Sequence, residues 1–225
     1  MVNQQSAYDI VFIGNYTKDT IVTPAGTRYV DGGGMNYAAN AAAHLGLKTA
    51  VVTRLSREDV HVVEGLQANG VDCFATYSPS STLMKLEYPT TDPDIRTLTV
   101  AGIAGSITAA DLDGFTARAA AINSSLRGEV GLDVIRALRE RGTLVAADMQ
   151  GFVRVLRGQS LIYEPWPEME ATLAQVDVVK SDAVEAEFLT GTKDIYQAAK
   201  IYAQMGPAEI VLTHKDGVLI YDRGA

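Results

Sequence analysis

The residues best suited to chemistry in this sequence are consecutive glycines placed directly before a helical segment of small residues. Residues 32–34 are all glycine, and residues 35–45 are rich in alanine. Glycines let a backbone approach a ligand closely, and a helix N-terminus offers free N–H groups and the positive end of the helix dipole. Asn15, Asp19 and Asp31 are near this turn in sequence and carry hydrogen-bond acceptors. We expect a pocket for a hydroxylated ligand here; a tight loop that closes the helix onto a sheet is the alternative.

The spacing of these glycines fits neither G-x-G-x-x-G nor G-x-x-x-x-G-K-[ST], the two common nucleotide-binding loops. The glycines also follow a predicted hairpin rather than the first strand. A Rossmann-type oxidoreductase is therefore the weakest of the functions considered.

A second candidate group follows the predicted strand at residues 176–179. Asp182 and Glu185 are three positions apart, which is the spacing of a capping box at a helix N-terminus. Their place after a buried strand also favours a binding role, because ligands of open α/β sheets bind beyond the carboxyl ends of strands. Asp148 follows another predicted strand and either orients a ligand or caps the strand end.

The elements that would position these residues alternate between strand and helix along most of the chain. Such alternation predicts a parallel sheet covered by helices on both faces. Short extended pieces interrupt the pattern and favour a separate small sheet, at residues 20–23, 27–30, 73–77, 82–88 and 96–100.

Composition excludes several classes of protein. The chain of 225 residues is 47% hydrophobic and 20% charged, which is enough apolar material for a core. Its formal net charge of −8 disfavours nucleic-acid binding. Apolar runs are too short to cross a bilayer, the N-terminus is polar, and Cys73 is the single cysteine. We expect a cytoplasmic protein with no membrane partner.

Several segments together resemble the ribokinase/PfkB carbohydrate-kinase family: Gly14-Asn-Tyr-Thr-Lys-Asp19, the glycines with Met35-Asn36-Tyr-Ala-Ala, Leu45-Gly46 and Val51-Val-Thr53. The resemblance extends over essentially the whole chain. It implies an α/β fold of three layers, αβα, over residues 1–225, with a mostly parallel central sheet. It also implies a small β-sheet lid, formed by about 20–31 and 73–101, that covers the sugar site and offers a homodimer contact.

The resemblance also implies roles for individual residues on the substrate side. Asp19, Gly32 and Gly33 would bind substrate hydroxyls, and Glu129 aligns with a position that contacts substrate. Asn36 is displaced by one position from the family's asparagine. This departure, together with a serine where the family has a second glycine, indicates a divergent branch that acts on a sugar or on a polyol such as inositol.

On the donor side, the resemblance implies that Asp182 replaces the family's asparagine and that Glu185 keeps the acid that organises Mg²⁺ and phosphate. Thr213 and Gly217 resemble the family's nucleotide-side turn. ATP and Mg²⁺ are the expected cofactors, and the expected reaction is phosphorylation of a hydroxyl on a sugar, polyol or nucleoside.

The family's catalytic aspartate belongs to a Gly-Ala-Gly-Asp-like loop, which we expect beyond Ala225, so that residues 1–225 would form an incomplete domain. A second hypothesis therefore stays open. The protein would be a sugar- or polyol-binding or regulatory homologue that keeps the pocket without catalysis.

Overall fold

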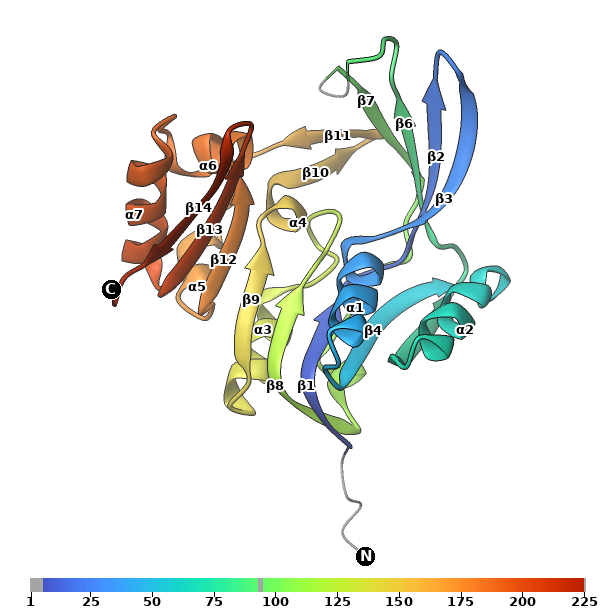
Figure 1. Cartoon of the computed structure of the whole chain (residues 1–225), viewed down its shortest axis with the longest axis horizontal. Helices are drawn as coiled ribbons and strands as arrows, with labels where there is room; N and C mark the ends of the chain where they lie inside the picture. The colour runs from blue at the N-terminus through green and yellow to red at the C-terminus, as the bar shows by residue number, and fades with distance from the viewer. Residues whose placement is uncertain (1–5, 93–94, 225) are drawn as a thin grey trace, which may run out of the picture.

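The computed structural model describes residues 6–92 and 95–224. Its larger sheet has eight strands in the order β14-β13-β12-β9-β8-β1-β4-β5, and all neighbours are parallel except β13 and β14 (Figure 1). The strands are β1 (Ser6–Ile13), β4 (Thr49–Ser56), β5 (Asp72–Ser78), β8 (Phe115–Ile122), β9 (Leu144–Asp148), β12 (Val178–Asp182), β13 (Glu209–His214) and β14 (Gly217–Asp222).

Helices cover both faces of this sheet, as the alternation of elements predicts. Residues of α1 and α2 share one buried cluster with β1 and β4, whereas residues of α3, α5, α6 and α7 share a second cluster with β8, β9, β12 and β13. The helices are α1 (Gly34–His44), α2 (His61–Ala68), α3 (Leu132–Glu140), the short α4 (Gln150–Val153), α5 (Met169–Leu173), α6 (Ala183–Thr190) and α7 (Ile195–Met205). The predicted three-layer arrangement is confirmed.

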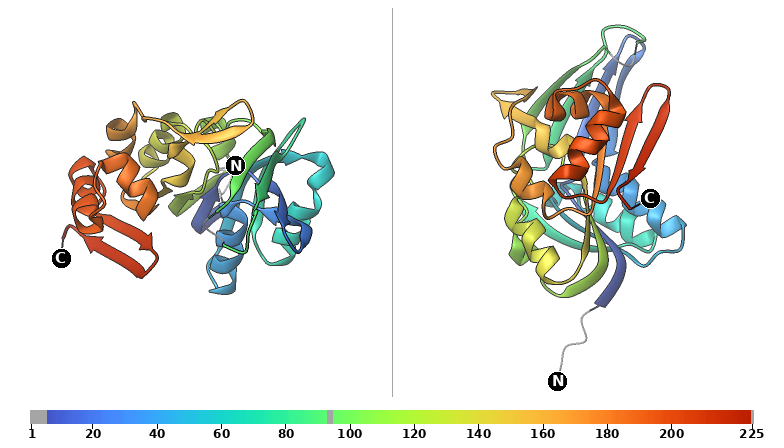
Figure 2. Two further views of the ribbon diagram at one scale, coloured as in Figure 1. Left: turned by 90° about the horizontal axis from the view of Figure 1, so that it is seen from above. Right: turned by 90° about the vertical axis from the view of Figure 1, so that its left-hand side faces the viewer.

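A second, mixed sheet of six strands has the order β10-β11-β7-β6-β2-β3. Figure 1 and the right view of Figure 2 show it extending beyond the edge at which β1, β8 and β9 end. Its strands are β2 (Thr17–Thr23), β3 (Gly26–Gly32), β6 (Thr82–Glu87), β7 (Thr97–Gly102), β10 (Arg154–Arg157) and β11 (Ser160–Tyr163). The small sheet expected from the sequence is therefore present, although its strands differ in part.

One strand assigned to that small sheet from the sequence lies in the larger sheet instead. Residues 73–77 fall within β5, which pairs in parallel with β4. The reason is packing: the Phe74 ring lies 4.7 Å from that of Phe115 and 6.0 Å from that of Tyr8, both of which belong to the main core. The predicted range 73–101 thus contributes only β6 and β7 to the second sheet, and residues 93 and 94 within it lie outside the described residues.

Three strands were not expected from the sequence. β8 is half alanine, with β-branched residues only at Thr116 and Ile122, yet it lies between β1 and β9. β10 and β11 form a hairpin that joins the second sheet where Ser160 pairs with Thr99. Among the described residues, no helix is both long and apolar enough to cross a membrane.

Candidate active site at the carboxyl edge of the sheet

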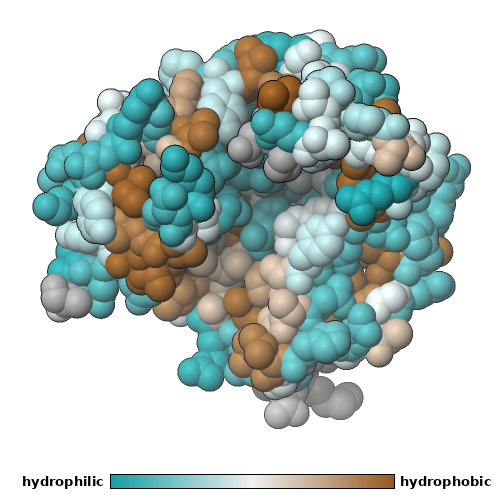
Figure 3. All heavy atoms as spheres, turned by 45° about the horizontal axis from the view of Figure 1, so that its top comes forward, coloured by the Kyte–Doolittle hydropathy of each residue, from teal (hydrophilic) through white to brown (hydrophobic). Residues whose placement is uncertain are grey.

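Polar residues lie at or just after the carboxyl ends of five neighbouring parallel strands. Across the sheet they are Thr213 on β13, Asp182 on β12, Asp148 on β9, Asn123 after β8 and Asn15 after β1. Such an edge is the usual ligand-binding position in open α/β sheets. The space-filling view shows the molecule hollowed in the middle of the face that looks onto this edge (Figure 3). The sheet therefore places the predicted substrate and donor residues along one side of the molecule.

The glycine bend and Asp19 meet as predicted. β2 and β3 pair as a hairpin that returns the chain to Gly32, where a methyl group would lie 2.2 Å from Asp19 Oδ2 and 2.5 Å from Thr17 Oγ1. Gly33 has a φ of 94°, which favours glycine, and a Cβ there would lie 2.9 Å from the Asn15 carbonyl oxygen. The Asp19 carboxylate therefore occupies the space that a side chain at position 32 would need.

Asp19 has the electrostatics of a ligand-binding carboxylate. Burial raises its pKa, and a hydrogen bond with Thr17 opposes that rise. Its Oδ1 is buried and has no hydrogen-bond partner among the described residues. A buried, unpartnered acceptor costs about 1–3 kcal/mol. A hydroxyl donor from a ligand would remove that cost.

The N-terminus of α1 is also open to a ligand. Gly33 precedes the helix and offers no side-chain cap, so the N–H groups of Gly34 and Met35 keep their capacity to donate, whereas that of Asn36 bonds to the Gly33 carbonyl over 3.0 Å. Asn36 lies in the first turn, but its amide donates to the Asp31 carbonyl over 3.0 Å and accepts from Asn40 over 3.2 Å. The amide of Asn36 thus holds the bend in shape, and its contact with a substrate stays a prediction.

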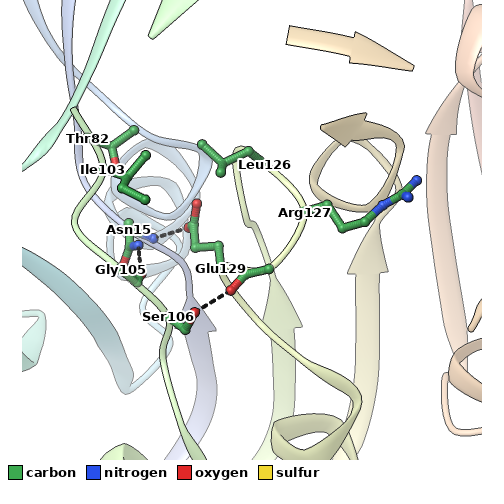
Figure 4. A pocket seen from close by; sticks show the side chains of 9 residues that line it. Asn15, Thr82, Ile103, Gly105, Ser106, Leu126, Arg127 and Glu129 are labelled. Carbon is green, nitrogen blue, oxygen red and sulfur yellow. Dashed lines mark hydrogen bonds between the residues drawn. The ribbon is translucent and has the colours of Figure 1, made fainter. Parts of the chain in front are cut away.

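Glu129 is a buried carboxylate that joins two neighbouring strand ends. It accepts a hydrogen bond from the backbone N–H of Asn15 (Figure 4). It also accepts one from the backbone N–H of Ser125 over 3.1 Å. Burial raises its pKa to about 7, against the opposing effect of these N–H groups. It also lines a cavity of about 250 Å³ with Asn15, Thr82, Ile103, Gly105, Ser106, Leu126, Arg127 and Gly128. Its closest partners are backbone groups, and its substrate contact stays a prediction.

The predicted donor residues lie together on β12, β13, β14 and α6. Asp182 and Thr213 are register partners on adjacent strands, and Gly217 begins the strand that returns from β13. The capping box is present: Asp182 accepts from the Glu185 N–H over 2.8 Å, and Glu185 accepts from the Asp182 N–H over 2.9 Å. This capping box stabilises the start of α6 and does not depend on a ligand.

Charge alternates along the middle of the edge. Lys180 Nζ lies 3.2 Å from Asp148 Oδ2, and its side chain is 42% exposed. Glu185 is buried, and burial raises its pKa, with further contributions from Asp182 and Asp148. Within the described ranges, no three His, Cys, Asp or Glu side chains could hold a metal ion by themselves.

Sequence comparison decides the family. Residues 6–225 match the pfkB family of carbohydrate kinases. The chain belongs to this family. A search of curated proteins gave no match.

Solved structures of pfkB-type kinases are similar to this chain over nearly its whole length. One is the sulfate complex of a pyrophosphate-dependent kinase in the ribokinase family, with 37% identity, a TM-score of 0.89, and coverage of 95% of this chain and 76% of that chain. Another is a pyrophosphate-dependent kinase complexed with a pyrophosphate analog and myo-inositol, at 35% identity, a TM-score of 0.87 and coverage of 95% and 75%. Arabidopsis thaliana ribokinase, complexed with ribose and ATP, shares the fold at 16% identity and a TM-score of 0.73, with coverage of 97% and 76%.

One polar residue at this edge of the sheet was not indicated by the sequence. Asn123 directly follows β8, the alanine-rich strand that sequence patterns do not reveal. Had that strand been recognised, the position rule for parallel sheets would have singled out Asn123.

We predict that Gly32→Ala damages both stability and the site. The added methyl would overlap Asp19 and Thr17, and overpacking of this kind costs about 1–3 kcal/mol. The measurement is the free energy of unfolding in urea. Gly65→Ala is the matched control, because Gly65 lies in α2 with open space around it, and it should leave stability unchanged or improve it. Equal effects of the two substitutions would contradict the close packing.

Proposed function

We propose that this protein is a kinase that transfers a phosphoryl group to a hydroxyl of a small polyol, with myo-inositol as the first candidate acceptor. The proposal rests on Asp19, at the carboxyl edge of the larger sheet. Its carboxylate packs against the glycine bend through Oδ2, and its buried Oδ1 has no partner among the described residues. The kinase with 35% identity that was solved with myo-inositol supports the choice of acceptor.

On the acceptor side, Asp19, Gly32 and Gly33 would hold hydroxyl groups. Asp19 offers a carboxylate acceptor, and the backbone at the start of α1 offers N–H donors. Because a hydroxyl both donates and accepts, a polyol can use both kinds of group at once. The second sheet would act as the lid over this acceptor.

Pyrophosphate is the donor that we propose, because the two structures with 35–37% identity are described as pyrophosphate-dependent kinases. ATP, which the family resemblance predicts, is the alternative donor. The donor would lie near Asp182, Glu185, Thr213 and Gly217, with Lys180 as a partly exposed cation beside them.

Mg²⁺ fits this edge as an ion shared between protein and phosphate. Mg²⁺ commonly uses only one or two carboxylates, with phosphate and water as its other ligands. Asp182 and Asp148 are accessible enough to serve, whereas Glu185 is buried in its capping box. Bound there, the ion would neutralise charge on the phosphates. The chain's own residues would position the ion through the box that fixes Asp182.

In the proposed reaction, the polyol hydroxyl oxygen forms a bond to phosphorus while the bond from that phosphorus to the bridging oxygen of pyrophosphate breaks. Orthophosphate leaves, and the hydroxyl proton passes to a base. The family resemblance predicts that base in a loop after Ala225.

The proposal also includes the oligomeric state and the location of the enzyme. β3 is an edge strand of the second sheet, and an open edge of this kind favours pairing with another copy, so a homodimer through the second sheet is expected. A cytoplasmic location is expected for a kinase that draws on phosphate donors.

The test combines binding with transfer. The protein is titrated calorimetrically with myo-inositol, ribose and fructose, and then incubated with each polyol, Mg²⁺ and either pyrophosphate or ATP while ³¹P NMR follows the phosphate products. We expect myo-inositol binding and a phosphomonoester formed from pyrophosphate. Transfer from ATP but not from pyrophosphate would identify ATP as the donor. Binding without transfer from either donor would favour the binding-protein hypothesis, and the absence of any binding would overturn the proposal.

A further inference from the structure

The second sheet joins the rest of the molecule close to Asp19, at the start of β2. Lys18 is the second residue of β2, and Asp19, the carboxylate that we propose to bind the polyol, directly follows it. β2 pairs in parallel with β6, which begins directly after Ser81 (Figure 1). Because the two strands are neighbours, contacts that fix the starts of β2 and β6 also fix the position of Asp19.

One buried carboxylate contacts the starts of both strands. Asp59 ends a short helical turn, η1 (Arg57–Asp59), that directly follows β4 of the larger sheet, and it is 3% exposed. Its Oδ1 lies 2.7 Å from Lys18 Nζ, and its Oδ2 accepts from Ser81 Oγ over 2.6 Å. Ser81 Oγ in turn accepts from the Ser56 N–H over 2.8 Å. These four residues form a junction network between the two sheets.

The junction network keeps Asp59 ionised. Burial alone would raise the pKa of this carboxyl, but hydrogen bonds from Lys18 and Ser81 outweigh burial and lower its pKa. A second charged contact lies nearby, with His61 Nε2 3.2 Å from Asp31 Oδ1, but both of its side chains are about half exposed. Exposed ion pairs contribute little. The buried Asp59 is therefore the stronger of these two charged contacts with the second sheet.

A buried charged network is better suited to fixing geometry than to raising stability. The cost of removing a carboxylate from water offsets much of what its ion pair gains, and apolar residues of similar size often give equal stability. Hydrogen bonds, in contrast, are favourable only over a narrow range of distances and angles. The network at Asp59 therefore points to a requirement for one orientation of the second sheet.

We propose that Asp59 is a positioning residue that sets the orientation of the second sheet through Lys18 and Ser81, and thereby holds Asp19 in place for the polyol. This inference rests on the proposed polyol kinase function. Both oxygens of Asp59 are occupied by protein partners, so its effect on the polyol is indirect. Its effect on binding should then be separable from its effect on stability.

The experiment compares wild type with Lys18→Met and with the double variant Lys18→Met/Asp59→Leu. Lys18→Met leaves a buried carboxylate without its cation, so it should lose both stability in urea and affinity for myo-inositol. The double variant replaces both charges with apolar side chains and should regain stability. Its Kd, measured by calorimetry, should nevertheless stay about tenfold or more above that of wild type. Lys18→Arg keeps the cation and should bind within about threefold of wild type.

Lys85→Met is the matched control. Lys85 also belongs to the second sheet and pairs with Glu87 over 2.9 Å, but both side chains are exposed. This variant should keep the Kd within about twofold of wild type. An equal loss of affinity in Lys85→Met would overturn the proposal. So would a double variant that regains wild-type affinity together with its stability, because Asp59 would then act on stability alone.

A second measurement needs no ligand. Spin labels at Tyr29→Cys in β3 and Leu45→Cys after α1, both at exposed positions, report the distance between the second sheet and the larger domain in a Cys73→Ser background. Electron paramagnetic resonance should give a broader or displaced distance distribution in the double variant than in wild type. Identical distributions would overturn the positioning role. Different distributions in a protein whose wild type binds no polyol would instead overturn the proposed function.

Discussion

Replacement of Asp19 by asparagine should abolish most of the affinity for a polyol while leaving the fold intact. The variant keeps the shape of the side chain against Gly32 but loses the negative charge. Hydrogen bonds to charged groups contribute about 1.5–3 kcal/mol, so we expect the Kd for myo-inositol to rise about 10- to 100-fold. Calorimetric titration of wild type and variant measures this change.

Although Asp19→Asn should lose affinity, it should keep or gain stability. Burial raises the pKa of Asp19, so its folded form binds a proton more tightly than the unfolded chain does. The stability linked to that proton is present below the unfolded pKa and is lost as pH rises through the folded pKa. At neutral pH the ionised Asp19 carboxylate therefore lowers the stability of the fold. Asp19→Asn should be as stable as wild type or more stable in urea unfolding.

Asp31→Asn provides the control for this prediction. Asp31 belongs to the same hairpin, but its carboxylate accepts from Tyr16 over 2.6 Å and lies 3.2 Å from His61 Nε2. Because its partners are protein groups, we expect the affinity for polyol to stay within about threefold of wild type, well under the cost of a charged hydrogen bond. A larger loss in Asp31→Asn than in Asp19→Asn would place the ligand elsewhere.

The parts of the fold that were predictable depend on local pattern. The apolar run that ends at Gly14 forms β1, the small residues after the bend form α1, and the spacing of Asp182 and Glu185 forms a capping box. Each of these follows from side chains within a few positions of one another. The choice of the strand with which a given strand pairs does not follow from such local patterns. Residues 73–77 have the pattern of a strand, but only packing of Phe74 on Phe115 assigns them to the larger sheet.

The candidate site shows the same division. The meeting of Asp19 with Gly32 was predictable, because a hairpin between them brings the two positions together. Asn123 was not, since it follows a strand of mostly small residues whose burial depends on neighbours far away in sequence. The hydrogen bond between Glu129 and Asn15 was not predictable either, because the two residues are 114 positions apart in the sequence.

The two loops joined by Glu129 both lie at the candidate site. Asn15 presents its carbonyl oxygen to Gly33, and Ser125 is two positions after Asn123. One carboxylate therefore connects the loop that supports the bend with the loop that follows β8. A positioning role for Glu129 explains its burial without any direct contact with the ligand.

Replacement of Glu129 by alanine should cause a large loss of stability together with a loss of the site. The substitution leaves the N–H groups of Asn15 and Ser125 without their acceptor in a buried place. At about 1–3 kcal/mol for each unpartnered group, we expect a decrease of about 2–6 kcal/mol in the free energy of unfolding. Glu140→Ala, at an exposed position on α3, should change it by about 0.5 kcal/mol or less. Comparable losses in both variants would contradict a special role for Glu129.

The pH dependence separates the charge of Glu129 from its hydrogen bonds. Its pKa is raised from 4.5 to about 7, chiefly by burial, so the linked stability is present below 4.5 and is lost as pH rises through about 7. Glu129→Gln cannot ionise. The difference in unfolding free energy between wild type and this variant should therefore shift in favour of the variant between pH 4.5 and 7, and stay constant above that range. A difference that stays constant from pH 4.5 to 7 would contradict the raised pKa and show that the backbone N–H donors offset or outweigh the effect of burial.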